Sequence, residues 1–384
     1  MKLHRAVSIL AAIQVVAAAA LPAISERAPN HAAFCKPVGR VFEIDEKAQY
    51  FMGTNTYWIG FLTNDDDVDL VMKHLKQVWH YYTKIALRKQ VLTRQLWIPP
   101  PGTVYYQALV PGSEPYINLG PDGLQRLDVV VDKAVHYGIK LIIPFINNWG
   151  DYGGINAYSN YFGTNATNWY TSDAAQAQYR KYIKTVVRRY KHSNAIFAWE
   201  LGNEPRCHGC STDIIFNWAK STSEYIKSLD SRHMVTLGDE GWLVSGGDGA
   251  YPYQGVEGVD FERNLSIETL DFGTFHQWPH AWGMPYEWGS QWILEHDAIG
   301  KKLGKPVVLE EYGNISTNHT ATRLPWLDTV YYDTEIAGDM YWQYADYIST
   351  GPTPDDGNAV YYGAPDYIPL VIDHAADMVS KPVP

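Results

Sequence analysis

Residues 195–205 read Ala-Ile-Phe-Ala-Trp-Glu-Leu-Gly-Asn-Glu-Pro, and this segment is the most informative about the fold. It begins as a short apolar run that is typical of a buried strand, and it ends in Asn203, Glu204 and the helix-incompatible Pro205. The same order, an apolar run that ends in polar or aromatic residues, recurs along the chain. It predicts strands at 50–57, 139–146, 195–201, 233–237, 270–276, 306–310 and 339–344, and an eighth strand is needed near Val91–Ile98.

Amphipathic stretches long enough to form helices lie between most of these strands. The clearest are Leu124–Tyr137, Ala174–Tyr190, Ile214–Leu229 and Glu287–Leu303. Asp122 is a candidate cap for the first of these helices, and Ser172 or Asp173 for the second. This alternation of strands and helices predicts a parallel sheet with crossover helices.

Polar and aromatic side chains follow nearly every predicted strand. They are found at 54–58 (TNTYW), 147–149 (NNW), 202–204 (GNE), 239–240 (DE), 276–278 (HQW), 310–312 (EEY) and 342–344 (WQY). In a closed barrel these strand ends meet at one face and form the active site, whereas an open doubly wound sheet uses only a few of them. We therefore predict an α/β protein with one catalytic domain at 34–384, a (β/α)8 TIM barrel.

The N-terminus has the order of a secretory signal peptide. Basic residues in the first five positions precede an apolar run at 6–20. A membrane anchor is the alternative, but the run is short and contains Ser8 and Gln14. We predict a signal peptide at 1–23, a short segment at 24–33, and a secreted mature protein that is not bound to a membrane.

Charge and aromatic content indicate the kind of partner. The formal net charge of −11 and the pI near 5.6 argue against nucleic acid, which needs clustered Lys and Arg. The 14 Trp and 28 Tyr exceed what a core requires, and flat rings with a polar handle suit the faces and hydroxyl rims of sugars. A monomer that binds a polysaccharide is the expectation.

Two glutamates stand at strand ends in the setting that glycosidic bond cleavage requires, which is one acid and one further carboxylate. Glu204 ends the stretch at 195–205, and Glu311 follows about three β/α units later, as strands 4 and 7 of a barrel would. Glu200 lies inside its strand, where a buried polar network is the expected setting. Neighbouring strand residues point opposite ways, so only one of Glu310 and Glu311 can face the sugar, and the residues alone leave open which.

These motifs resemble those of the fungal endo-β-1,4-mannanases of glycoside hydrolase family 5. The likeness covers nearly all of the mature chain, at 53–60, 144–149, 199–210, 236–241 and 310–313. Asn-Glu-Pro alone would indicate only the wider clan of barrel glycosidases, whereas Asn203-Glu204-Pro205-Arg206-Cys207 with Cys210 is much more specific.

The resemblance implies an endo-acting, retaining enzyme for β-1,4-mannosidic bonds in mannan, galactomannan and glucomannan, with no metal or organic cofactor. Glu204 is then the acid/base, with a pKa that we expect to be raised by Glu311, the nucleophile. The alternatives are a β-1,4-glucanase or exo-mannosidase on the same barrel, or a catalytically impaired carbohydrate-binding barrel.

Further site residues are implied by the same resemblance. Asn203 should bind the 2-hydroxyl of the sugar at the cleavage site, His276 should lie near the nucleophile, and Trp342 should form the floor under that sugar. The alternatives are that His276 satisfies buried partners and that Trp342 is a core residue. The other expected members are Arg206 on the leaving-group side, Trp149 as an aromatic platform, Tyr57 in the cleft, and Asp239 with Glu240 at the rim.

The chain departs from the family pattern in two places. Trp278 replaces the Tyr that usually follows the His of strand 6 by two residues, so that an indole N–H would have to orient Glu311. The second strand normally reads V-L-R-x-W-x-F, but residues 76–97 read KQVWHYYTKIALRKQVLTRQLW. The scramble over 77–99 resembles a reading-frame or splice-boundary error, and Arg94 is the expected substitute for the missing Arg.

Three cysteines allow one disulfide, and Cys207 with Cys210 could close a tight loop in an oxidising compartment. A zinc knuckle is the rival, but no second Cys or His pair has matching spacing. Cys35 is then left over. Four N-x-S/T acceptors for glycosylation fit secretion, and they are Asn165, Asn264, Asn314 and Asn318.

Overall fold

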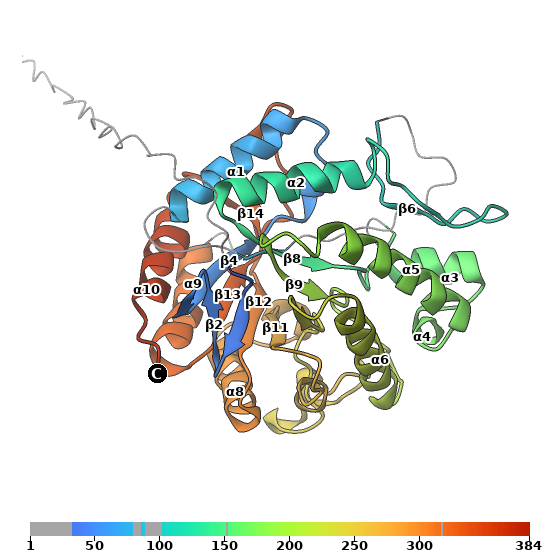
Figure 1. Ribbon diagram of the computed structural model, residues 1–384. Coiled ribbons are helices and arrows are strands. Elements are labelled where there is room, and N and C mark those ends of the chain that lie inside the picture. The colour runs from blue at the N-terminus through green and yellow to red at the C-terminus, as the bar shows by residue number, and fades with distance from the viewer. Residues whose placement is uncertain (1–32, 80–85, 89–101, 151–152, 316–317) are drawn as a thin grey trace, which may run out of the picture. The chain divides into compact units, whose positions relative to one another are not determined.

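The computed structural model describes residues 33–79, 86–88, 102–150, 153–315 and 318–384. The predicted signal peptide and Arg94 lie outside the described residues. Figure 1 shows helices arranged around a central set of strands. No helix in the described part of the chain is both long and apolar enough to cross a membrane.

The central sheet has eight parallel strands in the order β10-β9-β8-β5-β4-β13-β12-β11. Backbone hydrogen bonds from Asp271 N to Val235 O (2.8 Å) and from His276 N to Glu240 O (3.2 Å) join the two end strands, so the sheet closes into the predicted barrel. Its strands are β4 (Phe51–Asn55), β5 (Ala86–Arg88), β8 (Lys140–Pro144), β9 (Ile196–Glu200), β10 (Met234–Thr236), β11 (Gly273–Gln277), β12 (Val307–Tyr312) and β13 (Gly338–Tyr341).

The second strand is where the prediction was wrong. The position between β4 and β8 is taken by β5, in which Arg88 pairs with Asn55 on one side and with Ile142 on the other. A parallel strand between two neighbours is buried on both faces, so the apolar start of Ala86–Arg88 suits this position better than the polar centre of Val91–Ile98. The strand reads Ala-Leu-Arg, which matches the expected Val-Leu-Arg except at its first residue.

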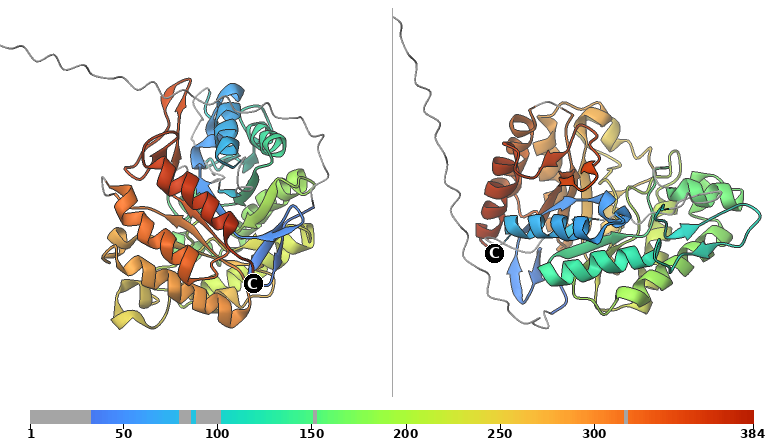
Figure 2. Two further views of the ribbon diagram at one scale, coloured as in Figure 1. Left: turned by 90° about the vertical axis from the view of Figure 1, so that its left-hand side faces the viewer. Right: turned by 90° about the horizontal axis from the view of Figure 1, so that it is seen from above.

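Helices cover the outside of the barrel, and those predicted are present with boundaries shifted by at most one residue. They are α1 (Asp65–Trp79), α2 (Leu124–Tyr137), α3 (Gly154–Phe162), α4 (Ala166–Trp169), α5 (Asp173–Tyr190), α6 (Asp213–Leu229), α7 (Phe261–Leu265), α8 (Trp288–Leu303), α9 (His319–Asp328) and α10 (His374–Ser380). Figure 2 shows the C-terminal helix α10, in red, lying along the outer side of the barrel.

The predicted helix caps were half right. Ser172 caps α5, because its side chain accepts a hydrogen bond from Ala175 N. Asp122 does not cap α2, which follows Gly123 without a side-chain cap. The Asp122 carboxylate instead accepts from the side chain of Asn118 (2.9 Å), within the preceding turn.

The N-terminal end of the barrel is closed by a small antiparallel sheet, which precedes the first barrel strand. It consists of β1 (Lys36–Val38), β2 (Val41–Ile44) and β3 (Lys47–Gln49). Phe42 of this sheet packs against Phe197 and Phe272 at centroid distances of 5.0 and 5.2 Å. This apolar plug leaves the opposite end, where the strands carry their polar residues, as the face available for a site.

Candidate active site

A cleft of about 820 Å³ lies at the carboxyl ends of the barrel strands. The predicted site residues within the described part of the chain line it, except His276 and Asp239, which are buried. The lining consists of Tyr57, Asn147, Trp149, Asn203, Glu204, Arg206, Glu240, Tyr251, Trp278, Ala281, Trp282, Glu311, Trp342, Asp356 and Asn358.

Glu204 is held in an unusual backbone conformation. Its φ is +52°, in the left-handed region that costs a residue with a Cβ roughly 1–3 kcal/mol. Backbone hydrogen bonds from Asn203 N to Ile146 O and from Glu204 N to Gly238 O, both 2.8 Å, hold the turn against the neighbouring strands. The turn aims the carboxylate into the cleft, where 5% of the residue is exposed.

A bulge decides which of the two adjacent glutamates faces the cleft. Phe275 of β11 pairs with Leu309 of β12, but the next residue, His276, pairs with Glu311, so Glu310 is the extra residue. Bulges of this kind redirect side chains next to active sites. Glu311 lines the cleft, whereas Glu310 is fully buried, with a carboxylate oxygen 3.5 Å from His276 Nε2.

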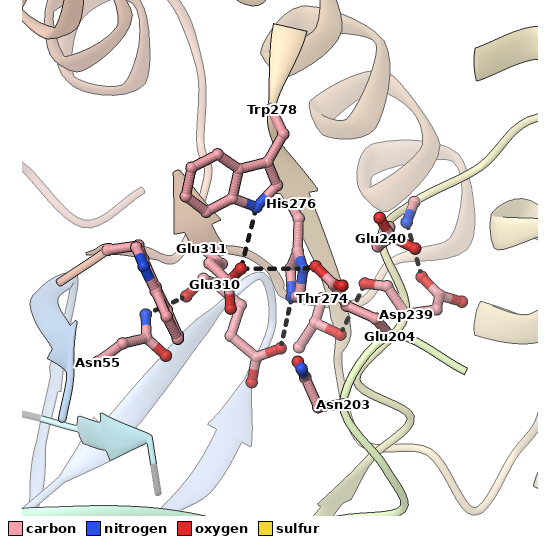
Figure 3. A network of polar contacts seen from close by, with 12 residues as sticks. Asn55, Asn203, Glu204, Asp239, Glu240, Thr274, His276, Trp278, Glu310 and Glu311 are labelled. Atoms are coloured by element: carbon pink, nitrogen blue, oxygen red, sulfur yellow. Dashed lines mark hydrogen bonds and ion pairs between the residues drawn. The ribbon is translucent and has the colours of Figure 1, made fainter. Parts of the chain in front are cut away.

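Glu204, Glu311 and His276 form a compact cluster (Figure 3). One oxygen of each carboxylate and one nitrogen of His276 lie within 4.8 Å of one another. His276 Nδ1 is 2.6 Å from Glu204 Oε1 and 3.9 Å from Glu311 Oε1. The histidine therefore lies near the predicted nucleophile, as expected, but its closest partner is the predicted acid.

Two tryptophans donate hydrogen bonds to the carboxylates. The Trp278 indole N–H donates to Glu311 Oε1 (2.9 Å), and that of Trp149 donates to Glu204 Oε2. Gly313 makes room for the larger ring at 278, because a Cβ at this position would lie 2.5 Å from the Trp278 ring. Replacement of the usual Tyr thus preserves a donor to Glu311.

The pKa of Glu204 is shifted in the opposite direction to the one expected. Burial opposes ionisation of this carboxyl, but the hydrogen bond and charge of His276, with further contributions from Arg206 and Trp149, lower its pKa to about 2. The expected increase in pKa assumed that the negative charge of Glu311 is the main influence on Glu204. It was wrong because the largest contributions that lower this pKa come from His276, whose Nδ1 is 2.6 Å from Glu204 Oε1.

Arg206 forms the wall of the cleft beside Glu204. Its guanidinium donates to both carboxylate oxygens of Glu240 (2.5 and 2.6 Å), and it lies between the rings of Trp149 and Trp242 at 4.9 and 5.2 Å. This pairing and stacking fixes a cation at the edge of the cleft.

Asp239 was wrongly predicted at the rim. It is 2% exposed and absent from the cleft lining, whereas its neighbour Glu240 is part of that lining. Its carboxylate accepts from Gly241 N (3.0 Å) and Asn264 Nδ2 (3.3 Å), and burial raises the pKa of Asp239 to about 7. Asp239 and Glu240 are consecutive and point to different sides of the strand end. The sequence does not show which of the two faces the cleft.

Trp342, which was predicted to lie under the sugar, is accompanied in the cleft lining by residues that were not predicted. Trp342 stacks on Tyr57 with ring centroids 5.3 Å apart and an interplanar angle of 3°. Its indole N–H donates to Asp356 Oδ2 (2.6 Å). Asp356 and Asn358 line the cleft but belong to a loop after the last barrel strand, where the Asp-Asp-Gly-Asn turn at 355–358 was the available signal. On the floor, the Asn203 side chain donates to Asn147 Oδ1 (2.9 Å).

The cluster also has the ligand types that could hold a cation, since Glu204, His276 and Glu311 are the kinds of residue that bind metals. Its surroundings suit another use. Trp149 and Trp278 each direct an indole N–H, which cannot bind a metal, at one of the carboxylates. This environment of donors favours acid–base and nucleophilic chemistry.

The predictions about the disulfide and the glycosylation acceptors were partly correct. Cys207 and Cys210 form a disulfide, whereas Cys35 is a buried thiol. Among the glycosylation acceptors, Asn165 and Asn318 are exposed. Asn264 and Asn314 were wrongly predicted, because they are 1% and 0% exposed and their side chains are bonded to Asp239 and Arg323. A glycan cannot be accommodated at either position in the folded protein.

Comparison with known proteins agrees with this arrangement. Residues 32–344 match the family described as GH family 5 β-mannosidase-like. The chain is 52% identical to a probable mannan endo-1,4-β-mannosidase A of Aspergillus flavus, over 91% of this chain and 89% of that protein. It is 50% identical to the mannan endo-1,4-β-mannosidase A of Hypocrea jecorina, over 93% and 81%.

Solved structures are similar as well. The endo-1,4-β-mannanase of Rhizomucor miehei superposes with a TM-score of 0.81 at 33% identity, over 91% of this chain and all of that chain. The endo-β-1,4-mannanase of Thermotoga petrophila gives a TM-score of 0.75 at 34% identity, over 88% and 79%.

Proposed function

Because the chain belongs to the β-mannosidase-like group of glycoside hydrolase family 5, we propose that it is a secreted endo-acting enzyme that hydrolyses β-1,4-mannosidic bonds. Mannan, galactomannan and glucomannan are the proposed substrates. One observation carries the proposal, namely that one carboxylate oxygen of Glu204 and one of Glu311 lie within 4.8 Å of each other in a cleft lined by aromatic residues. Retaining glycosidases place their carboxyl groups about 5–5.5 Å apart, which supports double displacement rather than inversion.

In the first step Glu311 attacks the anomeric carbon, and the bond from that carbon to the glycosidic oxygen breaks. Glu204 donates a proton to the departing oxygen, and a glycosyl ester of Glu311 remains. In the second step water attacks the anomeric carbon, Glu204 takes a proton from this water, and Glu311 leaves as a carboxylate. Atoms and charge are restored after one turnover.

The low pKa of Glu204 requires a source for the proton, and His276 provides one. The contact of 2.6 Å from His276 Nδ1 to Glu204 Oε1 can hold one proton in two ways, as imidazolium with carboxylate or as imidazole with carboxylic acid. Both forms have the same net charge. A neutral sugar that excludes water from the cleft destabilises the pair of imidazolium and carboxylate. The proton then moves onto Glu204, where the reaction needs it.

Cleavage within a chain is supported by the extent of the cleft. Besides the two carboxylates, the lining includes one group of residues around Arg206, with Glu240 and Trp149, and another around Trp342, with Tyr57 and Asp356. A polymer can therefore contact the protein on both sides of the bond that breaks.

The test compares Glu204→Gln with Glu311→Gln on galactomannan and on an aryl β-mannobioside with an activated leaving group. Both variants should lose polymer hydrolysis. Glu204→Gln should retain more activity on the activated substrate, since a good leaving group needs little protonation. Equal losses on the two substrates would contradict the assigned roles.

Wild-type controls separate the alternatives. Reducing-sugar release from carboxymethylcellulose would favour a glucanase, release only from short mannosides would favour an exo-mannosidase, and no release would favour a binding barrel. Proton NMR of the first product anomer tests retention directly, and an α-anomer as initial product would contradict double displacement.

A further inference from the structure

The bulge in β12 places Glu310 beside His276, outside the cleft lining (Figure 3). The residue is fully buried, and its carboxylate oxygen Oε2 lies 3.5 Å from His276 Nε2. Its backbone carbonyl accepts a hydrogen bond from Asn55 Nδ2 (3.1 Å), which ties the bulge to β4. The bulge therefore gives β12 two adjacent carboxylates in different surroundings, Glu311 in the cleft and Glu310 next to the buried histidine.

His276 is fixed between two carboxylates. Its backbone N–H donates to Glu240 O (3.2 Å), and its carbonyl accepts from the Trp292 indole N–H (2.8 Å). Its ring nitrogens face different carboxylates, since Nδ1 is 2.6 Å from Glu204 Oε1 whereas Nε2 is 3.5 Å from Glu310 Oε2. The ring is fully buried, so both nitrogens need partners within the protein.

The proposed reaction needs a proton on each ring nitrogen. A neutral imidazole has one N–H, and the contact of 2.6 Å with an ionised Glu204 would keep it on Nδ1. Transfer of that last proton to Glu204 would leave an imidazolate, so this form cannot supply the acid. The Nδ1 proton becomes transferable when Nε2 is protonated as well, and Nε2 is the nitrogen that faces Glu310.

Glu310 is suited to keep this second proton in place. A fully buried carboxylate is costly unless a cation lies close to it, and the imidazolium form of His276 is such a cation, 3.5 Å away. The attraction acts in both directions, so an ionised Glu310 favours the protonated ring. Without this charge the ring would lose the Nε2 proton at a lower pH.

We propose that Glu310 is a positioning residue of the reaction, which holds a proton on His276 Nε2 so that the proton on Nδ1 can pass to Glu204. The inference rests on the proposed function, because it takes Glu204 as the acid. In the first step the Nδ1 proton moves to Glu204 Oε1 as the proton of Glu204 moves to the departing oxygen. In the second step a proton of the attacking water returns through Glu204 to Nδ1. Glu310 stays ionised throughout and does not touch the sugar.

The other charged or titratable side chains described around His276 remain the same when only residue 310 is changed. They are Glu204, Arg206, Asp239, Glu240, His296 and Glu311. Arg206 and Glu240 are paired with each other, and burial lowers the pKa of His296 to about 4, so His296 is uncharged near neutral pH. A difference between the wild type and a variant at 310 therefore reports the charge at this position.

The test compares pH profiles of full-length variants. Glu310→Gln keeps the side-chain size and removes the charge, and Glu310→Asp restores the charge. Asp339→Asn is the matched control, because Asp339 is also a buried carboxylate beside a histidine, but its partner is His374 Nε2 (2.7 Å). The kcat/KM is measured against pH with mannopentaose and with the activated aryl β-mannobioside. NMR of isotope-labelled histidine nitrogens, assigned with His276→Gln, reports the protons on the ring.

For mannopentaose, the alkaline limb of the kcat/KM profile should move about 1–3 pH units lower in Glu310→Gln, the usual effect of an opposite charge at this range. The activated substrate should lose much less, because its leaving group needs little protonation. Glu310→Asp should lie close to the wild type, and Asp339→Asn should lower stability without moving the limb. An unmoved limb, or equal losses at every pH and on both substrates, would overturn the proposal.

The NMR titration separates this inference from the proposed function. In the wild type Nε2 should be protonated at the pH of maximal activity, and Glu310→Gln should lose this proton at lower pH. If the glutamine variant does not fold, the wild type still decides, because an unprotonated Nε2 at that pH would overturn the proposal. A wild type with a protonated Nε2 that does not cleave mannopentaose would refute the proposed function and support the contact between Glu310 and the imidazolium.

Discussion

Removing the indole N–H that donates to Glu311 tests whether Trp278 replaces the hydrogen bond that the usual Tyr would make. Trp278→Phe keeps an aromatic ring but removes the N–H that lies 2.9 Å from Glu311 Oε1. A hydrogen bond to a charged group is worth about 1.5–3 kcal/mol, which corresponds to about 10- to 150-fold in rate. Because Glu311 regains its charge only when the glycosyl ester breaks, the loss should fall mainly on that second step.

Stopped-flow kinetics with an aryl β-mannobioside that has an activated leaving group would separate the two steps. Trp278→Phe should show a burst of released aryl alcohol followed by a kcat lowered about 10- to 150-fold. Trp278→Tyr should recover most of the lost rate, since a phenol also donates.

Gly313→Ala supplies an independent check, because its Cβ would meet the Trp278 ring at 2.5 Å and displace the donor without removing it. The reasoning would be refuted if kcat for Trp278→Phe stayed within about twofold of the wild type, or if Phe and Tyr behaved alike.

Three further predictions concern stability, modification and the second strand. Burial raises the pKa of Asp239 from 3.8 to about 7, so the free energy of unfolding of the wild type falls as pH rises through this interval. Asp239→Asn should therefore be more stable than the wild type by up to roughly 4 kcal/mol above pH 7 and by much less at pH 5. Urea unfolding at the two pH values measures the difference. Glycopeptide mapping of the secreted protein should find glycans only at exposed acceptors, and a glycan at either buried acceptor would contradict the structure; the exposed pair is Asn165 and Asn318, and the buried pair is Asn264 and Asn314. Arg88→Ala should lower galactomannan kcat/KM at least tenfold whereas Arg94→Ala should not, because the register places Arg88 at the end of β5, beside Asn55. The opposite result would favour Arg94 as the residue that replaces the Arg of the usual second strand.

Two failures of sequence reasoning lie at places where an interaction is not local. The second strand was predicted at Val91–Ile98 from a short apolar run, but β5 is chosen by pairing with β4 and β8, which lie far from it in sequence. Likewise, an N-x-S/T triplet is a local pattern, whereas the burial of Asn264 and Asn314 depends on Asp239 and Arg323.

Local patterns in the sequence were enough to predict the barrel and the strand ends that carry its reactive residues. Alternating apolar runs and amphipathic stretches specify strands and helices through local periodicity, and polar residues at strand ends collect at one face of any closed parallel sheet. This reasoning predicted that Asn203, Glu204 and Trp342 lie at one face, and all three line one cleft, whereas Arg206 was implied by the family resemblance.

How those residues act on one another depends on contacts that form only in the folded protein. The bulge at Glu310 turns Glu311 into the cleft, and His276, rather than Glu311, controls the pKa of Glu204. The turn at 355–358 is visible in the sequence, but only the fold brings Asp356 to the Trp342 indole N–H. Register, burial and the distance between charges arise from contacts between segments remote in the chain, so no local pattern encodes them.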